Sequence, residues 1–274
     1  FRRCGVMMAA VQNSSQNDAA RKVVIKLGFV IPVYNHGSTV GSVIRSLAVY
    51  GRPVIVVDDG NDAANKMQIR AALGSCPLAV LVERKKNGGK GKAMMSGVLK
   101  ARELGLTHIF QIDSDGQHDA SRAAFFIEAA EKNPSCIICG TPVFDESVPP
   151  SRKKGREISN RWARFVSLSD EIVDAMCGFR IYPVEPYCRL LTHRACVDAR
   201  MGYDADILVH FVWSGVRIKS YPVRVTYPAD GISNFRMVRD NVRISLSFTK
   251  LFLGMIVRLP VLAFRAICRR RAHG

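Results

Sequence analysis

The sequence predicts an α/β fold with a mainly parallel sheet flanked by helices on both faces. The first observation behind this prediction is that short apolar runs rich in β-branched residues alternate with amphipathic segments from residue 23 to residue 140. The second is that Gly, Pro and Asp bound most of these segments. The third is that polar residues follow the apolar runs directly. This alternation indicates βαβ units, whose ligands bind at the carboxyl ends of the strands.

The expected strands are Val23–Val33, Val54–Val57, Leu78–Val82, Thr107–Ile112 and Ser135–Cys139. The expected helices carry apolar residues at three- and four-residue spacing, over Ser38–Tyr50, Asp62–Leu73, Lys92–Leu104 and Ser121–Lys132. Asp62 is suited to cap a helix start, and glycine follows three of the four helices.

The rhythm changes after Gly140. Residues Thr141–Gly155 are Pro-rich and basic, which predicts a mobile loop. Beyond it we expect helices at Glu157–Leu168 and Ala205–Ser214, and strands at Gly178–Tyr182 and Val216–Tyr227. We therefore expect one domain over residues 23–228 and a tail over residues 229–274. Residues 1–22 contain no long apolar core, so they are expected to form a disordered leader rather than a signal peptide or membrane span.

The chain is strongly basic. Its 274 residues carry a formal net charge of +17, which indicates an anionic partner: nucleic acid, a phospholipid surface or a phosphorylated substrate. A nucleic-acid module would place aromatic residues among the basic ones, whereas the apolar residues of the tail are mainly aliphatic, so no nucleic-acid partner is expected. Most of the eight cysteines lie in apolar stretches, which fits buried thiols in the reducing cytoplasm.

The tail is both basic and apolar. From residue 229 onward nine Lys or Arg face two Asp. Leu246–Ile256 and Leu259–Ile267 are apolar but interrupted by basic residues, and neither approaches the roughly 20 residues of a spanning helix. This pattern favours amphipathic helices lying on an anionic membrane surface, with Pro260 dividing the segment into two helices. A terminal helix packed on the domain, or a dimer interface, is the alternative.

Acidic residues follow the expected strand that ends at Ile112. Asp113 and Asp115 are one residue apart where the strand runs into a loop, and Gln117 adds a neutral oxygen. Mg²⁺ and Mn²⁺ take such oxygen ligands, together with water and a substrate diphosphate. A surface turn is the alternative, because Asp, Ser and Gly are the usual turn formers.

Four motifs occur in order and carry a resemblance: Val30–Asn35, Val56–Gly60, Asn87–Ala93 and Asp113–Asp115. Over about residues 23–235 the chain resembles the family 2 glycosyltransferases of the GT-A fold. Within them it looks most like the dolichyl- or polyprenyl-phosphate mannose synthase group. The resemblance implies a Rossmann-like sheet, a GDP- or UDP-linked sugar donor, a divalent cation (Mg²⁺ or Mn²⁺) and a lipid-linked acceptor.

The resemblance also implies roles for individual residues. Those expected at the nucleotide and its phosphates are Pro32, Tyr34, Asn35, Asp58, Asp59, Lys90 and Asp113. Asp58 and Asp59 would bond the base or ribose, while Lys90 opens a helix and would bring its ammonium to the diphosphate. Asp113, Asp115 and Gln117 match the metal motif, and Asp115 counts as catalytic through the cation. Asn61 departs from the pattern, because the family often has Ser there.

Asp204 and Asp206 are the remaining expected catalytic residues. In many family 2 enzymes an acid in this region removes a proton from the acceptor hydroxyl. A lipid phosphate is already anionic, and Asp204 would then orient it. The alternative is that both carboxylates cap the start of a helix. Acceptor contacts are expected from two basic groups, Arg152, Lys153, Lys154 and Arg156 in the first, and Arg236 and Arg239 in the second.

These expectations combine into a metal-dependent, inverting glycosyltransferase that is peripheral on the cytoplasmic face of the membrane. Two other functions are alternatives for a chain with this fold. A nucleotidyltransferase would place a glycine-rich loop directly after the first strand, but Pro32–His36 stands there. A non-catalytic, membrane-associated scaffold of the same fold is the second. The sequence does not separate GDP- from UDP-linked donors.

Overall fold

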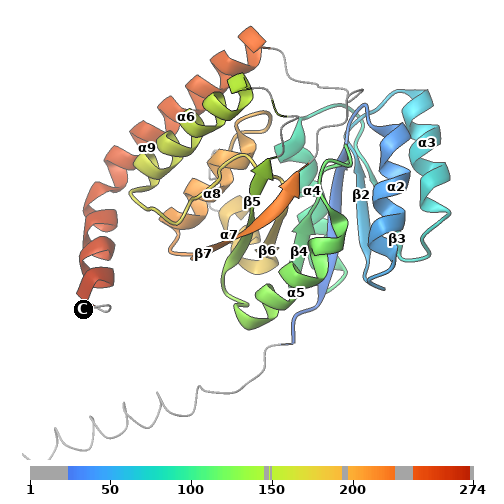
Figure 1. Ribbon diagram of the computed structural model, residues 1–274, viewed down its shortest axis with the longest axis horizontal. Helices are drawn as coiled ribbons and strands as arrows, with labels where there is room; N and C mark the ends of the chain where they lie inside the picture. The colour runs from blue at the N-terminus through green and yellow to red at the C-terminus, as the bar shows by residue number, and fades with distance from the viewer. Residues whose placement is uncertain (1–23, 145–147, 149, 193–196, 226–236, 272–274) are drawn as a thin grey trace, which may run out of the picture.

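A seven-stranded sheet lies at the centre of the residues that the computed structural model describes, which are 24–144, 148, 150–192, 197–225 and 237–271 (Figure 1). The strand order is β3-β2-β1-β4-β6-β5-β7. The strands are β1 Leu27–Val33, β2 Val54–Asp58, β3 Ala79–Glu83, β4 His108–Gln111, β5 Ile137–Phe144, β6 Arg180–Pro183 and β7 Ile218–Val225. The prediction of an α/β fold with a mainly parallel sheet is confirmed.

One strand, β6, runs against its neighbours. The pairs β1–β2, β2–β3, β1–β4 and β5–β7 are parallel, whereas β6 is antiparallel to both β4 and β5. Arg180, the first residue of β6, therefore pairs with Gln111, the last residue of β4, and with Cys139 of β5. The chain thus enters β6 at the edge where the parallel strands end.

Helices cover both faces of the sheet. On one face lie α2 Gly37–Ala48, α3 Ala63–Leu73 and α5 Ala123–Lys132, which follows the short helix η1 Ala120–Arg122. On the other lie α4 Lys90–Glu103, α7 Val184–Thr192 and α8 Tyr203–Trp213. Successive residues of β1 point to opposite faces, so Phe29 and Ile31 join the first core and Val30 the second. Burial on both faces explains the continuous apolar runs of the central strands.

The structure corrects the expectation of a loop over Thr141–Gly155. Strand β5 continues to Phe144, and helix α6 spans Pro150–Ser167. The Pro-rich segment is held extended because β5 pairs with β7 along its whole length, as far as Phe144 opposite Val225. Helix α7 was not foreseen either. Residues 145–147 and 149 lie outside the described residues.

The tail also differs from expectation. Helix α9 spans Met237–Arg271 with Pro260 inside it, so the prediction of two helices divided at that residue is wrong. Proline removes one backbone donor, but contacts beyond it hold the helix on course: Leu262 is buried, and the Arg265 guanidinium donates to the carbonyl of Trp213. Helix α9 runs beside α6 (Figure 1), with Phe252 stacked on Phe165.

The length and composition of α9 also correct the expectation that no segment of the tail is long enough to span a membrane. Arg239–Arg265, 27 residues, is long and apolar enough to cross a membrane. The basic residues within it are too widely spaced to exclude this. Of its most apolar stretch, 28% is buried against the rest of the protein. The expected leader and residues 229–236 of the expected tail lie outside the described residues.

Candidate functional site

The Lys90 ammonium joins two carboxylates that are far apart in sequence. It lies 2.8 Å from Oδ1 of Asp113 and 2.8 Å from Oδ2 of Asp204. Lys90 is the first residue of α4, Asp113 follows β4, and Asp204 lies in the first turn of α8. The structure therefore brings three of the expected site residues, from three separate motifs, to the carboxyl edge of the parallel strands.

The charged side chains around Lys90 differ in how well their neighbours stabilise them. Burial opposes the ionised form of Asp113, but Lys90 and His118, whose Nε2 is 3.7 Å away, outweigh it and hold the pKa of Asp113 well below its usual value. Burial likewise opposes the charge of Lys90, and the two carboxylates overcome it and raise its pKa. For Asp115, burial and the negative charge of Asp113 both raise the pKa. Asp115 is therefore the carboxylate that would gain most from an added cation.

Two residues of the sheet, Gln111 and Arg180, donate hydrogen bonds to Asp204. Gln111 donates from Nε2 to Oδ1 of Asp204 at 3.2 Å. The Arg180 guanidinium donates from Nη1 to the Asp204 carbonyl at 2.6 Å and lies 3.9 Å from its Oδ1. Arg180 is fully buried, and its Nε and Nη2 atoms have no hydrogen-bond partner among the described residues. Sequence reasoning gave neither residue a role, although a basic residue in a strand-like run signals a buried partner.

Asp206 is turned away from this group. Its Oδ2 accepts from the backbone N–H of Asp198 at 2.8 Å and from the Ser247 hydroxyl at 3.3 Å. Its Oδ1 is 3.1 Å from Nε2 of His210. Because Ser247 belongs to α9, Asp206 fastens the start of α8 to the C-terminal helix. These contacts give Asp206 a positioning role, and its expected catalytic role stays a prediction.

Asp59 also has a structural use. Its Oδ1 accepts from Nε of Arg84 at 2.7 Å and from the backbone N–H of Gly88 at 3.0 Å, and its Oδ2 accepts from the N–H of Gly89 at 2.7 Å. The residue is only 2% exposed. The carboxylate that was expected to bond the base thus holds the loop that leads to Lys90. The sequence did not indicate that Arg84 would pair with this carboxylate.

Asn61 ties the ends of β1 and β2 together. Its Nδ2 donates to the carbonyl of Val33 at 2.9 Å and to Oδ1 of Asp58 at 2.7 Å, and its Oδ1 accepts from the N–H of Asn35 at 2.7 Å. This network holds Asn35 in the left-handed region, at φ 59°, which asparagine tolerates better than most residues. Asn61 therefore supplies the local hydrogen bonding that its departure from the family pattern had left open.

The remaining nucleotide-side residues lie at the same edge. Oδ2 of Asp58 is buried, has no hydrogen-bond partner among the described residues, and lies 4.0 Å from Nζ of Lys66. Pro32 is half-buried near the end of β1, and Tyr34, which follows that strand, is exposed. Of the two carboxylates expected to bond the base or ribose, Asp58 is thus the one with an oxygen that accepts no hydrogen bond from the described residues.

The expected metal ligands form an incomplete set by themselves. Asp115 accepts at Oδ1 from the backbone N–H of Gln117 at 3.1 Å. Within the described ranges, no cluster of three or more His, Cys, Asp or Glu side chains is arranged to hold a metal. Two hard carboxylates are present, so further ligands would come from water and substrate.

A glycine seats Asp113. A Cβ atom at Gly178 would lie 2.1 Å from Oδ2 of Asp113, so the carboxylate occupies space that only glycine leaves free. Gly178 precedes β6, and the antiparallel direction of that strand brings it to the site. The sequence predicts Gly178 only as the first residue of a strand, with no role in the site.

The basic residues expected to contact the acceptor have different fates. Arg156 forms an ion pair with Asp174, with Nε 2.5 Å from Oδ2, and it packs over the ring of Phe144. Burial opposes the charge of Asp174, but Arg156 lowers its pKa. Lys153 and Lys154 are exposed on α6, and Arg239 is exposed on α9. The side chains of Arg152 and Arg236 lie outside the described part of the chain.

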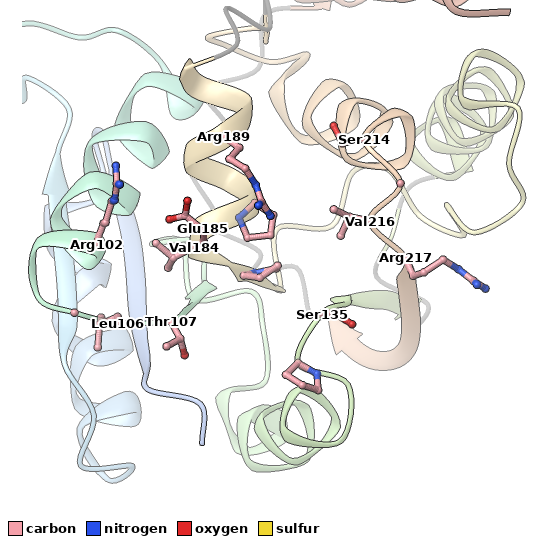
Figure 2. Close-up of a pocket in the computed structure, with 15 residues that line it drawn as sticks. Arg102, Leu106, Thr107, Ser135, Val184, Glu185, Arg189, Ser214, Val216 and Arg217 are labelled. Atoms are coloured by element: carbon pink, nitrogen blue, oxygen red, sulfur yellow. The ribbon is translucent and has the colours of Figure 1, made fainter. Parts of the chain in front are cut away.

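A hollow of about 620 Å³ lies at the opposite edge of the sheet (Figure 2). Its lining includes Thr107, at the amino end of β4, together with Glu185 and Arg189 of α7. Arg217 points away from the hollow in Figure 2 and pairs with Glu171 at 2.7 Å. None of the expected site residues lines it, so this hollow is separate from the site around Lys90.

The fold is that of a GT-A glycosyltransferase. The structure is similar to that of glucosyl-3-phosphoglycerate synthase from Mycobacterium tuberculosis, solved with Mn²⁺, UDP-glucose and phosphoglyceric acid. The TM-score is 0.63 at 16% identity, over 85% of this chain and 80% of that one. Residues 29–191 match the family model described as Glycosyl transferase family 2, and the chain therefore belongs to that family of enzymes, which take a sugar from a nucleotide-sugar donor.

Two relatives match most of the chain at low identity. The polyprenol monophosphomannose synthase of Mycolicibacterium smegmatis is 22% identical over 240 residues, which cover 85% of this chain and 88% of that protein. The dolichyl-phosphate beta-glucosyltransferase of Dictyostelium discoideum is 24% identical over 251 residues, 82% of this chain and 75% of that one. Both names place the sugar on a polyprenol or dolichyl phosphate.

The seat of Asp113 gives a first test. Gly178→Ala should displace the carboxylate, and a shift of about 1 Å in a reacting group costs on the order of 100-fold in turnover. Sugar transfer or donor hydrolysis measures the effect. Gly155→Ala is the matched control, because a Cβ there meets nothing within 4 Å and alanine favours the helix. Equal activity of the two variants would show that Asp113 does not need its present position.

Proposed function

We propose that this glycosyltransferase uses Mg²⁺ or Mn²⁺ to transfer a sugar, with inversion, from a GDP- or UDP-linked donor to a lipid-linked acceptor at the cytoplasmic membrane face. The observation that carries the proposal is the meeting of Asp113 and Asp204 at Lys90. Asp113 belongs to the half of the sheet that holds the nucleotide-side residues, and Asp204 belongs to the half that follows β6. Donor and acceptor groups thus face one point.

The residues present suit a hard divalent cation. Asp113 and Asp115 supply carboxylate oxygens, the ligand type that Mg²⁺ and Mn²⁺ prefer. Burial and the charge of Asp113 raise the pKa of Asp115, and a bound cation would oppose both effects. When bound, the cation would act as a Lewis acid that stabilises charge on the leaving nucleotide diphosphate.

The chain's own groups would do the rest of the work. The amino end of α4 presents the Lys90 ammonium and the positive end of the helix dipole, which favour a diphosphate. Asp58 and Asp59 lie at the carboxyl end of β2, where they would meet the base or ribose. Asp204 would take the proton of an acceptor hydroxyl, or orient an acceptor phosphate that is already anionic. Inversion needs one displacement at the sugar, so no enzyme nucleophile is required.

The surface of α9 supports a lipid acceptor. Five exposed apolar residues, spaced four and seven apart, share one face of the helix and form what we call the α9 stripe: Val242, Leu246, Leu253, Val257 and Phe264. The opposite face is buried on the protein through Phe248, Leu251, Met255 and Leu262. Because α9 is apolar on both faces, its outer face needs a second apolar environment.

Charge favours a membrane as that environment. Arg243, Lys250, Arg258 and Arg265 recur every seven or eight residues. Arg258 and Arg265 contact Trp213 at the end of α8. Arg243 and Lys250 are therefore the two of this series beside the α9 stripe that have no contact with Trp213 among the described residues. Long basic side chains at the edge of an apolar face reach lipid headgroups while the face enters the bilayer. Helix α6, beside α9, adds exposed Trp162 and Phe165. The Asp206–Ser247 contact supports this arrangement, because it joins α9 to the helix that carries Asp204.

The metal assignment predicts a strong effect of a single charge. Asp115→Asn should lower sugar transfer by on the order of 100-fold or more, because both cation binding and leaving-group stabilisation weaken. Donor turnover in Mn²⁺ or Mg²⁺, before and after EDTA, measures it. Wild-type turnover that survives complete removal of divalent cations would contradict the metal role. Absence of any donor hydrolysis or transfer would favour the non-catalytic scaffold.

Asp204 should affect turnover more than donor binding. Asp204→Asn keeps the shape but loses the charge, so with a hydroxyl acceptor kcat should fall by on the order of 100-fold. With a polyprenyl phosphate acceptor the fall should be milder. Steady-state kinetics with both acceptor types separate the two. A loss of donor affinity with unchanged turnover of bound donor would assign Asp204 to the donor instead.

The α9 stripe predicts binding to anionic vesicles. Exchanging Leu253, Val257 and Phe264 for Gln should release the protein from phosphatidylglycerol vesicles, because each buried CH₂ contributes about 0.8 kcal/mol. Cosedimentation measures the effect. The matched control exchanges three exposed apolar residues of the α2–α3 side, Val49, Met67 and Leu78, and should bind as wild type does. Equal vesicle binding of the two triple variants would show that the α9 stripe does not contact the membrane.

A further inference from the structure

Lys90 occupies an oxygen that a cation at Asp113 would need. Its ammonium is 2.8 Å from Oδ1 of Asp113, and both side chains are about three-quarters buried, at 25% and 24% exposed. An ion pair that is shielded in this way is much stronger than one on the surface. The positive charge that balances Asp113 is therefore supplied by the chain itself.

The backbone around Lys90 is fixed in place. Asp59 accepts hydrogen bonds from the N–H groups of Gly88 and Gly89, just before Lys90. The N–H of Gly91, just after it, donates to the carbonyl of Ala199 at 2.9 Å. Because the main chain is held on both sides, the ammonium stays within reach of Asp113 and is set up to return there.

Two cations at one carboxylate repel each other unless further negative charge lies between them. A nucleoside diphosphate supplies that charge, since its oxygens can accept from the ammonium while others bind the metal. Binding of the diphosphate would remove Lys90 from Asp113 and from Asp204 together. The donor would then complete the metal site and release the acceptor-side carboxylate in one movement.

We propose that Lys90 acts as a resident cation that keeps Mg²⁺ or Mn²⁺ off Asp113 until the donor's diphosphate draws its ammonium away. Metal and donor then bind as one cooperative unit, and the acceptor carboxylate becomes accessible only afterward. This inference rests on the proposed metal-dependent function. Thermodynamic linkage requires that the nucleotide and the metal raise each other's affinity by the same factor.

The test measures Mn²⁺ binding to the full chain, from the electron paramagnetic resonance signal of free Mn²⁺. Lys90→Met should bind Mn²⁺ alone about tenfold more tightly than wild type, within the usual range of coupling between two sites. Lys90→Arg keeps the charge and should resemble wild type. Adding UDP or GDP should raise the Mn²⁺ affinity of wild type about tenfold or more, and that of Lys90→Met by a much smaller factor.

Two controls make the outcomes distinct. Asp113→Asn in the Lys90→Met background should remove the gained affinity for Mn²⁺. Lys90→Gln is a second neutral variant, which replaces Lys90→Met in the test if that variant folds poorly. If wild type binds Mn²⁺ with UDP or GDP but neither neutral variant gains affinity for Mn²⁺ alone, the resident-cation role is overturned and the proposed function stands. If no variant binds Mn²⁺ with or without nucleotide, both fail together.

Discussion

Carboxylates gathered at one edge of the sheet set the constraint to which the rest of this structure responds. Like charges in a partly buried place raise one another's free energy, so each needs a donor or a cation nearby. Asp59 takes backbone N–H groups and Arg84, while Asp113 and Asp204 share Lys90. Buried Arg180 then supports Asp204 through its carbonyl. The loop before α4, the start of α8 and the entry to β6 are all positioned by this need.

The sequence was sufficient for the fold class because alternation of apolar runs and amphipathic helices is a local signal. Strand direction is not local. Strand β6 has four residues, and nothing in them shows that it runs antiparallel between β4 and β5. The extension of β5 to Phe144 likewise depends on pairing with β7, about 80 residues away in sequence. Pro260 predicted a break that contacts of Leu262 and Arg265 with the rest of the protein override.

The candidate site was predictable in position and less so in assignment. Lys90 and Asp113 follow strands β3 and β4 and meet at the carboxyl edge, as residues after parallel strands should. Asp204 reaches the same point from the start of α8. Asp59 and Asp206, however, were expected to act on substrates, and the structure uses them to hold its own loop and helix. Besides Arg84 and His210, their partners are backbone N–H groups and a serine hydroxyl of α9. Such groups leave no charge pattern in a sequence, so a carboxylate used for scaffolding looks the same as one used for chemistry.

The insertion of β6 between β4 and β5 has a consequence in time as well as in space. All strands from β1 to β5 leave the ribosome before β6, yet β4 and β5 are joined only through it. Pairings between distant segments form slowly, and an unpaired strand edge is open to wrong partners. Gly178, which seats Asp113, also arrives with β6. A nascent chain that ends between Phe144 and Gly178 therefore has strands β1 to β5, an open edge on β4, and no seat for Asp113.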